Sequence, residues 1–239
     1  MSTTTQTTAL STVVDPGEAE ELNARFETAA PEEVLQWTVD RFPDDRLVLS
    51  STFGVGGMVL IHKLSQMGVQ VPIVFIDTLY HFPETLEHAR RVEERFGLDL
   101  RVHRPAASRE AFEAEHGDRL WETDEERFHR LTKVEPMRRA LQGAQGWITG
   151  RRRDQSPTRA ALPIVEVSNW IKVNPLATWS LDRVWEYIRM HDLPYNPLHD
   201  RGYASIGDEP LTTPVQAGEH ERAGRWRGSV RLECGLHGI

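Results

Sequence analysis

Short apolar runs alternate with longer amphipathic stretches up to about residue 190 of this chain. The runs are rich in Val, Leu and Ile, and they predict buried strands at residues 46–51, 72–76, 98–103 and 146–149. The stretches between them predict helices, which we place from Pro31 onwards and at residues 55–67, 83–96 and 135–141. Strands that alternate with helices in this way form a parallel sheet with helices on both faces. The pattern therefore predicts a twisted α/β fold.

The chain loses this regularity after the fourth strand. Residues 164–173 predict a pair of short strands, and residues 180–190 predict a helix that Ser180 caps. Beyond His191, proline and glycine recur every few residues and interrupt any long element. We therefore divide the chain into a disordered lead-in of residues 1–15, an α/β domain of residues 16–191 and a loop-rich C-terminal segment of residues 192–239 that ends in a mobile tail.

Composition narrows the classes of function. Hydrophobic residues make up 39% of the chain and charged residues 27%, as in an ordinary soluble protein. The apolar runs are too short to cross a membrane, and residues 1–11 lack the basic start and apolar centre of a secretory signal. A net charge of -8 argues against non-specific nucleic-acid binding. We expect a cytoplasmic protein that binds neither membranes nor nucleic acids.

Hydroxyl and glycine residues follow the first strand and open the next helix. They are Ser50, Ser51, Thr52, Phe53 and Gly54, with Gly56 and Gly57 just behind. Backbone amides at a helix N-terminus bind phosphate, and ligands of open parallel sheets bind at the carboxyl ends of strands. The lysine and the spacing of a P-loop are absent. The loop predicts an anion site, with a glycine-rich turn needed only for packing as the alternative.

A carboxylate and a hydroxyl follow the second strand. Asp77 and Thr78 begin a polar and aromatic segment that continues to Pro83. Such groups at the carboxyl end of a strand suit a ribose or a base. On these residues alone, a turn ahead of Pro83 is the preferred explanation.

Arginines gather after the fourth strand and again near the C-terminus. The two groups are Arg151, Arg152, Arg153 and Arg159, and Arg222, Arg225, Arg227 and Arg231. Three consecutive arginines cannot all face one way, and a solvated surface run is the usual explanation. The position after a strand favours at least one arginine that grips an anion through a forked contact. Lys133 adds a further charge.

The chain contains one cysteine, Cys234, close to its C-terminus. A single thiol has no disulfide partner in its own chain, which agrees with a reducing cytoplasm. Most such cysteines are small buried hydrophobes. Cys234 instead lies between Glu233 and Gly235, with arginines upstream and His237 downstream, and this setting favours a reactive thiolate. Cys234 and His237 alone make only a weak metal half-site.

Six segments together resemble the thioredoxin-dependent 3′-phosphoadenosine 5′-phosphosulfate (PAPS) reductases. They are SSTFG (50–54), the DT…FPET segment (77–85), KVEPMRRAL (133–141), GRRRDQS (150–156), YNPLHDRGYASIGD (195–208) and ECGLH (233–237). The resemblance implies an adenine-nucleotide α-hydrolase-like fold related to the ATP pyrophosphatases, with residues 16–191 as its nucleotide-binding domain. It also implies a homodimer.

The resemblance assigns most of the candidate residues, by position, to an anionic substrate. Phosphate or sulfate is expected to contact Ser50, Ser51, Thr52, Phe53 and Gly54, and the nucleotide is expected to contact Asp77 and Thr78. Anionic oxygens are assigned to Lys133 and Arg151, and closure over the substrate is assigned to Arg222 and Arg225. Cys234 is expected to be the nucleophile, and His237 to orient or tune it.

The related adenosine 5′-phosphosulfate (APS) reductases share this fold and tail but bind a 4Fe–4S cluster through a Cys-Cys pair and a C-x-x-C pair. Here Phe128 and His129 replace the first pair, and Asp208 and Leu211 replace the second. Four thiolate ligands cannot come from a chain with one cysteine. We therefore expect no iron–sulfur cluster, no metal and no other bound cofactor.

These expectations predict a reaction. The Cys234 thiolate attacks the sulfur of PAPS, adenosine 3′,5′-bisphosphate leaves, and an S-sulfocysteine forms. Thioredoxin or glutaredoxin then releases sulfite, because the chain has no resolving cysteine. This is a step of assimilatory sulfate reduction. The loop favours PAPS over APS as the substrate. Many APS enzymes have acidic residues where Gly56 and Gly57 lie, and the absence of these carboxylates here lowers the repulsion against a 3′-phosphate.

Three alternatives stay open. The first is a cluster-free APS reductase. The second is an adenylating enzyme of the ATP pyrophosphatase type, which needs an SGG-x-D-S loop that the chain lacks. The third is a redox sensor that binds nucleotide without turnover and uses Cys234 as its switch.

Overall fold

The computed structural model describes residues 13–216, 218–227, 233 and 235–238. One six-stranded sheet organises them, with strands β1 (Leu47–Ser50), β2 (Ile73–Ile76), β3 (Leu100–His103), β4 (Gly146–Thr149), β5 (Val165–Val167) and β6 (Ile171–Val173). The strand order is β3-β2-β1-β4-β6-β5. All neighbouring strands run parallel except β5, which pairs antiparallel with β6 at one edge. The α/β prediction is confirmed, with this antiparallel edge strand as the departure from a purely parallel sheet.

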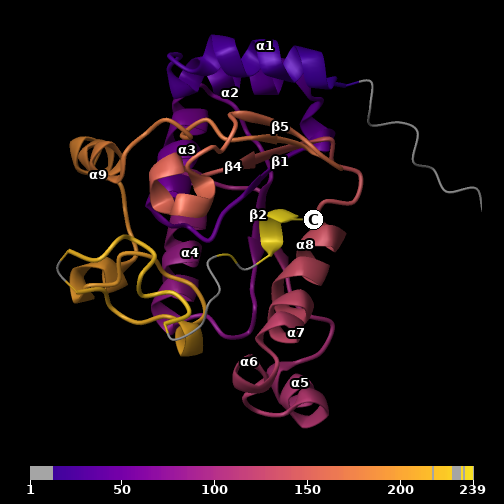
Figure 1. The fold of residues 1–239 in the computed structure, drawn as a ribbon, viewed down its shortest axis with the longest axis vertical. Helices are drawn as coiled ribbons and strands as arrows, with labels where there is room; N and C mark the ends of the chain where they lie inside the picture. Colours follow the sequence, from indigo (N-terminus) through magenta and orange to yellow (C-terminus); the bar gives the residue numbers. More distant parts are fainter. Residues whose placement is uncertain (1–12, 217, 228–232, 234, 239) are drawn as a thin grey trace, which may run out of the picture.

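Helices cover both faces of the sheet (Figure 1). The α-helices are α1 (Pro16–Phe26), α2 (Pro31–Arg41), α3 (Val55–Gln66), α4 (Pro83–Phe96), α5 (Arg109–His116), α6 (Leu120–Thr123), α7 (Glu125–His129), α8 (Glu135–Ala140) and α9 (Leu181–Met190). A π-helical turn, η2 (Arg130–Val134), joins α7 to α8. The 3-10 turns are η1 (Asp44–Arg46), η3 (Arg153–Gln155), η4 (Pro157–Arg159), η5 (Pro197–Arg201), η6 (Glu209–Leu211) and η7 (Leu236–Gly238).

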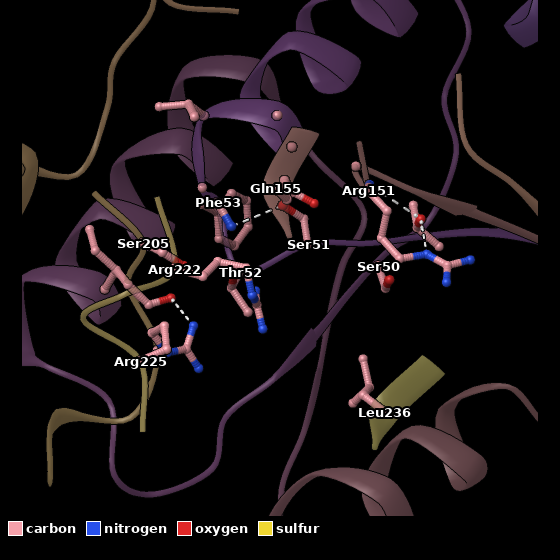
Figure 2. A pocket seen from close by; sticks show the side chains of 18 of the residues that line it. Ser50, Ser51, Thr52, Phe53, Arg151, Gln155, Ser205, Arg222, Arg225 and Leu236 are labelled. Carbon is pink, nitrogen blue, oxygen red and sulfur yellow. Dashed lines mark hydrogen bonds between the residues drawn. The ribbon is translucent and has the colours of Figure 1, made fainter. Parts of the chain in front are cut away.

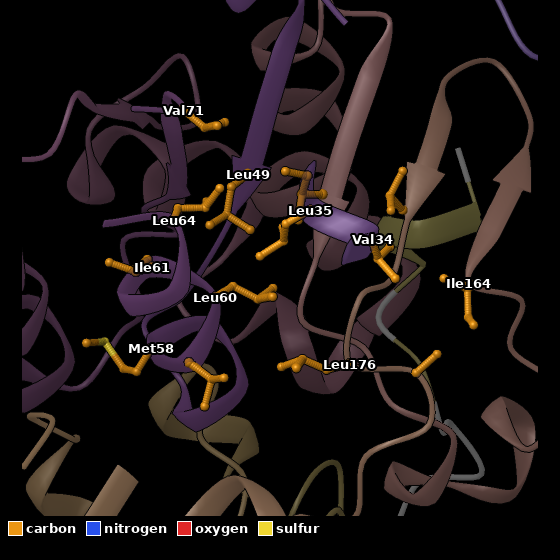
Figure 3. Close-up of a cluster of buried hydrophobic side chains, with 14 of the residues drawn as sticks. Val34, Leu35, Leu49, Met58, Leu60, Ile61, Leu64, Val71, Ile164 and Leu176 are labelled. Carbon is orange, nitrogen blue, oxygen red and sulfur yellow. The ribbon is translucent and has the colours of Figure 1, made fainter. Parts of the chain in front are cut away.

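Successive side chains along each strand point to opposite faces of the sheet, and this separates two apolar layers. Leu47 and Leu49 of β1 point into the main core with α1 to α4 and α9, part of which Figure 3 shows. Val48 points to the opposite face, where it packs with Trp147 and with Met137 of α8. In each layer, buried aliphatic and aromatic side chains remove apolar surface from water, which is the main driving force for this architecture.

Local sequence explains where several helices begin and end. Pro83 starts α4, and Gly97 ends it in the left-handed conformation at φ 59°. The Ser180 hydroxyl accepts a hydrogen bond from the Arg183 amide at the start of α9, as predicted. The helices that the sequence pattern missed, α1 and α5 to α7, are short or strongly charged. Only Phe112 of α5 is buried, so the helical period of apolar residues is weak there.

The ends of the chain bear on the predicted boundaries. Residues 1–12 of the predicted lead-in lie outside the described residues, whereas Val14 belongs to the main core and Asp15 caps α1. Among its described residues, the segment after residue 191 contains only the short turns η5, η6 and η7. No helix in the described part of the chain is long and apolar enough to cross a membrane.

Candidate active site

A cavity opens at the carboxyl ends of β1 and β4. The chain runs outward from β1 to β2 and β3 and then returns to β4 on the other side of β1, so this is the point where the strand order reverses. Ligands of open α/β sheets bind at such a point. The lining comes from the β1–α3 loop (50–57), the β4 end (149–152), the segment 204–207, and Glu221, Arg222, Arg225, Trp226, Leu236 and His237, among others (Figure 2).

The β1–α3 loop turns sharply at Phe53, which has a positive φ of 57°. Its amide donates to the Ser51 hydroxyl at 2.9 Å, and its carbonyl accepts from Nε2 of His88 at 3.2 Å. Burial lowers the pKa of His88 to about 4, so this donor is a neutral imidazole. The Phe53 ring packs in the core against Phe75. The Phe53 ring therefore holds the loop in place.

Glycines let the loop and the β4 end approach each other. A Cβ on Gly57 would lie 2.2 Å from the Ser51 hydroxyl, and a Cβ on Gly56 would lie 3.0 Å from the Gly150 carbonyl. Gly54 caps α3 without a side-chain hydrogen bond to the first amides of the helix. These amides and the Ser51 hydroxyl lie together at a helix N-terminus, where the helix dipole favours an anion.

The three consecutive arginines have three different partners. Arg153 leaves the cavity and pairs with Glu27. Arg151 donates to Glu166 at 2.8 Å; burial lowers the pKa of its guanidinium, and Glu166 opposes this shift. Arg152 is fully buried.

Arg152 is a charged residue of the cavity lining that sequence reasoning did not single out. Its Nε donates to Asp154 at 3.0 Å and its Nη2 to Glu221 at 2.5 Å. Arg152 belongs to the cavity lining, and its Nη1 lies beside Gly56 and has no hydrogen-bond partner among the described residues. A buried guanidinium donor without a partner, on a residue that lines a cavity, suits an anionic ligand. Nothing in the run of arginines distinguishes Arg152 from its neighbours, because the difference arises from packing.

Lys133 reaches the cavity, but its ammonium group is bonded to the fully buried carboxylate of Asp208. Thr78 donates to the other oxygen of this carboxylate at 2.7 Å. Burial by itself raises the pKa of Asp208, but Lys133 and the nearby histidines outweigh it and hold that pKa well below its usual range. The charge of Lys133 is thus already compensated within the protein.

Asp77 differs from its neighbour Thr78 in that it is not part of the cavity lining. Its carboxylate accepts from Arg104 at 2.7 Å and from the Leu79 amide at 3.0 Å. This is the turn that the sequence offered as the alternative for this segment. The remaining predicted residues that the structure describes, His237 included, all line the cavity.

The four positions that carry cysteine in the cluster enzymes meet in space. Phe128 and Leu211 lie in one apolar cluster. His129 accepts a hydrogen bond from Trp226 at 2.8 Å, and it lies close enough to Asp208 to contribute to the lowered pKa of that carboxyl. Within the described part of the chain, no group of three or more His, Cys, Asp and Glu side chains could hold a metal ion.

The two arginines expected to close over the substrate stack on Trp226. The guanidinium carbons of Arg222 and Arg225 lie 5.1 and 4.6 Å from its ring centroid. Arg225 also donates to the Ile206 carbonyl at 3.2 Å. Figure 2 shows both arginines on the side of the β1–α3 loop that faces away from Arg151.

Cys234 lies outside the described residues, but residues on either side of it are held at the cavity. Arg159 grips the Glu233 carboxylate with two donors, at 2.7 and 2.6 Å. The His237 ring stacks on Trp147, with 5.2 Å between centroids. Shielding from water and the neighbouring cations, of which Arg151 is the strongest, hold the pKa of His237 well below its usual value. The imidazole is therefore neutral near pH 7.

This sheet, with a glycine-rich loop and buried arginines at its switch point, defines a protein of the adenine-nucleotide α-hydrolase-like fold. The fold is shared with an FMN adenylyltransferase of Candida glabrata at 16% identity and a TM-score of 0.56. The family model of the phosphoadenosine phosphosulfate reductase domain matches residues 46–214. The chain belongs to the phosphoadenosine phosphosulfate reductase family and is an oxidoreductase that reduces a sulfonucleotide.

Relatives named as PAPS reductases and relatives named as APS reductases are both similar to this chain. A phosphoadenosine phosphosulfate reductase of Emericella nidulans is 40% identical over 90% of this chain and 74% of its own length. An adenosine 5′-phosphosulfate reductase of Anoxybacillus flavithermus is 44% identical over 85% of this chain and 88% of its own length. The crystal structure of a PAPS reductase from Candida auris in a phosphate complex has a TM-score of 0.76 and 38% identity, covering 84% of this chain and 98% of that one.

Proposed function

We propose that this protein reduces PAPS to sulfite and adenosine 3′,5′-bisphosphate, with thioredoxin or glutaredoxin as reductant, in assimilatory sulfate reduction. One observation carries the substrate choice. The buried Arg152 has an Nη1 donor without a partner among the described residues, and this donor lies beside Gly56 of the β1–α3 loop, which contains no carboxylates. A cation that faces a carboxylate-free loop suits a substrate with an additional phosphate. The relatives' names support either substrate, so a cluster-free APS reductase is the second candidate.

The proposed chemistry has two displacement steps. The Cys234 thiolate attacks the sulfur of PAPS, an S–S bond forms, and the bond from sulfur to the bridging oxygen breaks, so that adenosine 3′,5′-bisphosphate leaves. A thiolate of the reductant then attacks the Cys234 sulfur and expels sulfite with the bonding electron pair. The second thiol of the reductant resolves the mixed disulfide, and the reductant is left oxidised by two electrons.

The surroundings of the tail support this role for Cys234. Three arginines of the cavity lining, Arg151, Arg159 and Arg222, all act on His237, three positions further along the chain. We expect these arginines to favour the thiolate form of Cys234, because cations stabilise negative charge nearby. A neutral His237 that stacks on Trp147 orients the tail instead of adding charge to it. We keep the cytoplasmic location and the homodimer as predictions from the sequence.

The test compares substrates and looks for the intermediate. We expect kcat/KM for PAPS to exceed that for APS by about tenfold or more, the range of one or two charge-assisted hydrogen bonds to the 3′-phosphate. A preference for APS contradicts the substrate choice and supports the second candidate. Incubation with PAPS alone should add the mass of one SO₃ group to the protein, and thioredoxin should remove it. If no adduct forms, the covalent mechanism is wrong.

The approach of Gly57 to Ser51 gives a further prediction. Gly57→Ala should displace the Ser51 hydroxyl and weaken the binding of adenosine 3′,5′-bisphosphate by about tenfold or more. Gly54→Ala is the matched control, because a Cβ there meets no atom within 4 Å. Titration calorimetry and thermal unfolding of both variants distinguish a local effect from loss of fold. Equal affinities in the two variants would show that this contact does not shape the anion site.

A further inference from the structure

Lys172 is a buried cation that the proposed reaction does not use and that is not part of the cavity lining. It lies in β6 between Ile171 and Val173, which both point into the main core, so its side chain points to the opposite face of the sheet. There its ammonium donates to Glu166 at 3.0 Å and to the His237 carbonyl at 2.7 Å. A buried lysine is costly unless it is paired, so these contacts explain how it is tolerated.

The register of the sheet builds a row of side chains around Lys172. Glu166 of β5 and Trp147 of β4 are its direct neighbours across the two adjacent strands. The Lys172 ammonium lies 5.4 Å from the centroid of the Trp147 ring. The row presents a carboxylate, an ammonium and an indole face to the same side of the sheet.

The C-terminal turn η7 lies on this row. The His237 ring stacks on Trp147 at an interplanar angle of 24°, and Leu236 packs against the apolar cluster that contains Trp147. The Lys172 bond to the His237 carbonyl adds a directional contact. Figure 1 shows this turn, in yellow, between the strands and α8.

We propose that Lys172 and Trp147 form a dock for η7, and that Lys172 is a positioning residue for the reaction. The proposal rests on the proposed function of the cysteine two residues before Leu236. Arg159 anchors Glu233 on one side of that cysteine, and the dock anchors His237 on the other. Two anchors restrict where an attacking group between them can lie, and a restricted, near-attack position raises the rate of a displacement.

The test uses Lys172→Met, which replaces the apolar part of the side chain with one of equal length and removes the ammonium. We expect the rate of S-sulfonation at saturating PAPS, followed by intact mass, to fall about tenfold or more, the effect of one charged hydrogen bond. The affinity for adenosine 3′,5′-bisphosphate should change by less than about twofold, because the cavity lining is unchanged. Lys172→Arg keeps a donor and should recover part of the rate.

Lys63→Met is the matched control. Lys63 is also buried, pairs with Glu32 and lies 4.3 Å from the centroid of the Tyr187 ring, but it belongs to α3 and is not part of the cavity lining. We expect Lys63→Met to keep the wild-type rate of S-sulfonation, even if its thermal unfolding temperature falls as much as that of Lys172→Met. A wild-type rate in Lys172→Met, or a loss of nucleotide affinity in proportion to the rate, overturns the proposal.

Hydrogen exchange tests the dock without any substrate. The Gly238 amide donates to the Gly235 carbonyl at 3.1 Å in the docked turn. Exchange in the C-terminal peptide should be faster in Lys172→Met than in the wild type and in Lys63→Met. Equal exchange in all three overturns the dock. If wild-type protein forms no SO₃ adduct while exchange still responds to Lys172, the proposed function fails and the dock stands.

Discussion

Replacement of Cys234 by serine is expected to reduce sulfite release by at least about a thousandfold, since covalent catalysis is lost with its nucleophile. A serine hydroxyl is almost the same size as the thiol but is hardly ionised near neutral pH. We propose that the arginines acting on His237 favour a thiolate at Cys234, and such cations cannot bring a hydroxyl into the same state. The variant should therefore bind substrate and stop before the first displacement.

Two measurements make this prediction specific. The affinity of Cys234→Ser for adenosine 3′,5′-bisphosphate should match that of the wild type, because the β1–α3 loop and the arginines are unchanged. Intact mass after incubation with PAPS should show no SO₃ adduct, and the chain has no other cysteine that could carry one. An adduct in this variant, or sulfite release near the wild-type rate, would assign the nucleophile to another group.

Replacement of Asp208 by asparagine is expected to lower the free energy of unfolding by about 3–5 kcal/mol, the usual cost of leaving one partner of a buried ion pair without its counterpart. Asparagine keeps the shape of the side chain, but Lys133 would then face a neutral amide. Thr78 can still donate to the amide oxygen, so the lost charge dominates the effect. Urea unfolding followed by fluorescence measures this difference.

The same ion pair predicts a dependence of stability on pH. The pKa of Asp208 is lower in the folded protein than in the unfolded chain, where it is about 3.9, so the unfolded chain binds the extra proton first. This contribution to stability is therefore complete above about pH 5 and is lost as the pH falls below about 4. The stability of Asp208→Asn should fall less steeply in that range than the stability of the wild type. Parallel curves would contradict the assigned pKa.

A double variant separates the ion pair from other effects of burial. Lys133→Met with Asp208→Leu removes both charges and should be less destabilised than either single variant, because no charge is then left buried alone. If the two single losses simply add, Lys133 and Asp208 do not act as a pair.

Sequence patterns predicted the framework of the sheet accurately where apolar periodicity was strong. The predictions of β4 at residues 146–149 and α4 at residues 83–96 agree with the structure to the residue. The helices α5 to α7 were missed because their few buried residues leave little periodic signal, whereas α1 was missed although Ala19, Leu22 and Phe26 have helical spacing. The antiparallel direction of β5 was also not predicted, since a short apolar run does not encode the direction in which it pairs.

Local sequence by itself determined the α/β class, the glycine-rich loop after the first strand, the single thiol and the lack of cysteines for a cluster. These properties depend on periodicity, on residue type and on neighbours along the chain. Only the tertiary structure decided that Arg152 has the unpaired donor, that Lys133 is bonded to Asp208 and that Lys172 holds the terminal turn. The Lys133 and Lys172 contacts join residues 75 and 65 positions apart. Buried charges are paired by the packing of distant segments, and no local pattern records which partners that packing brings together.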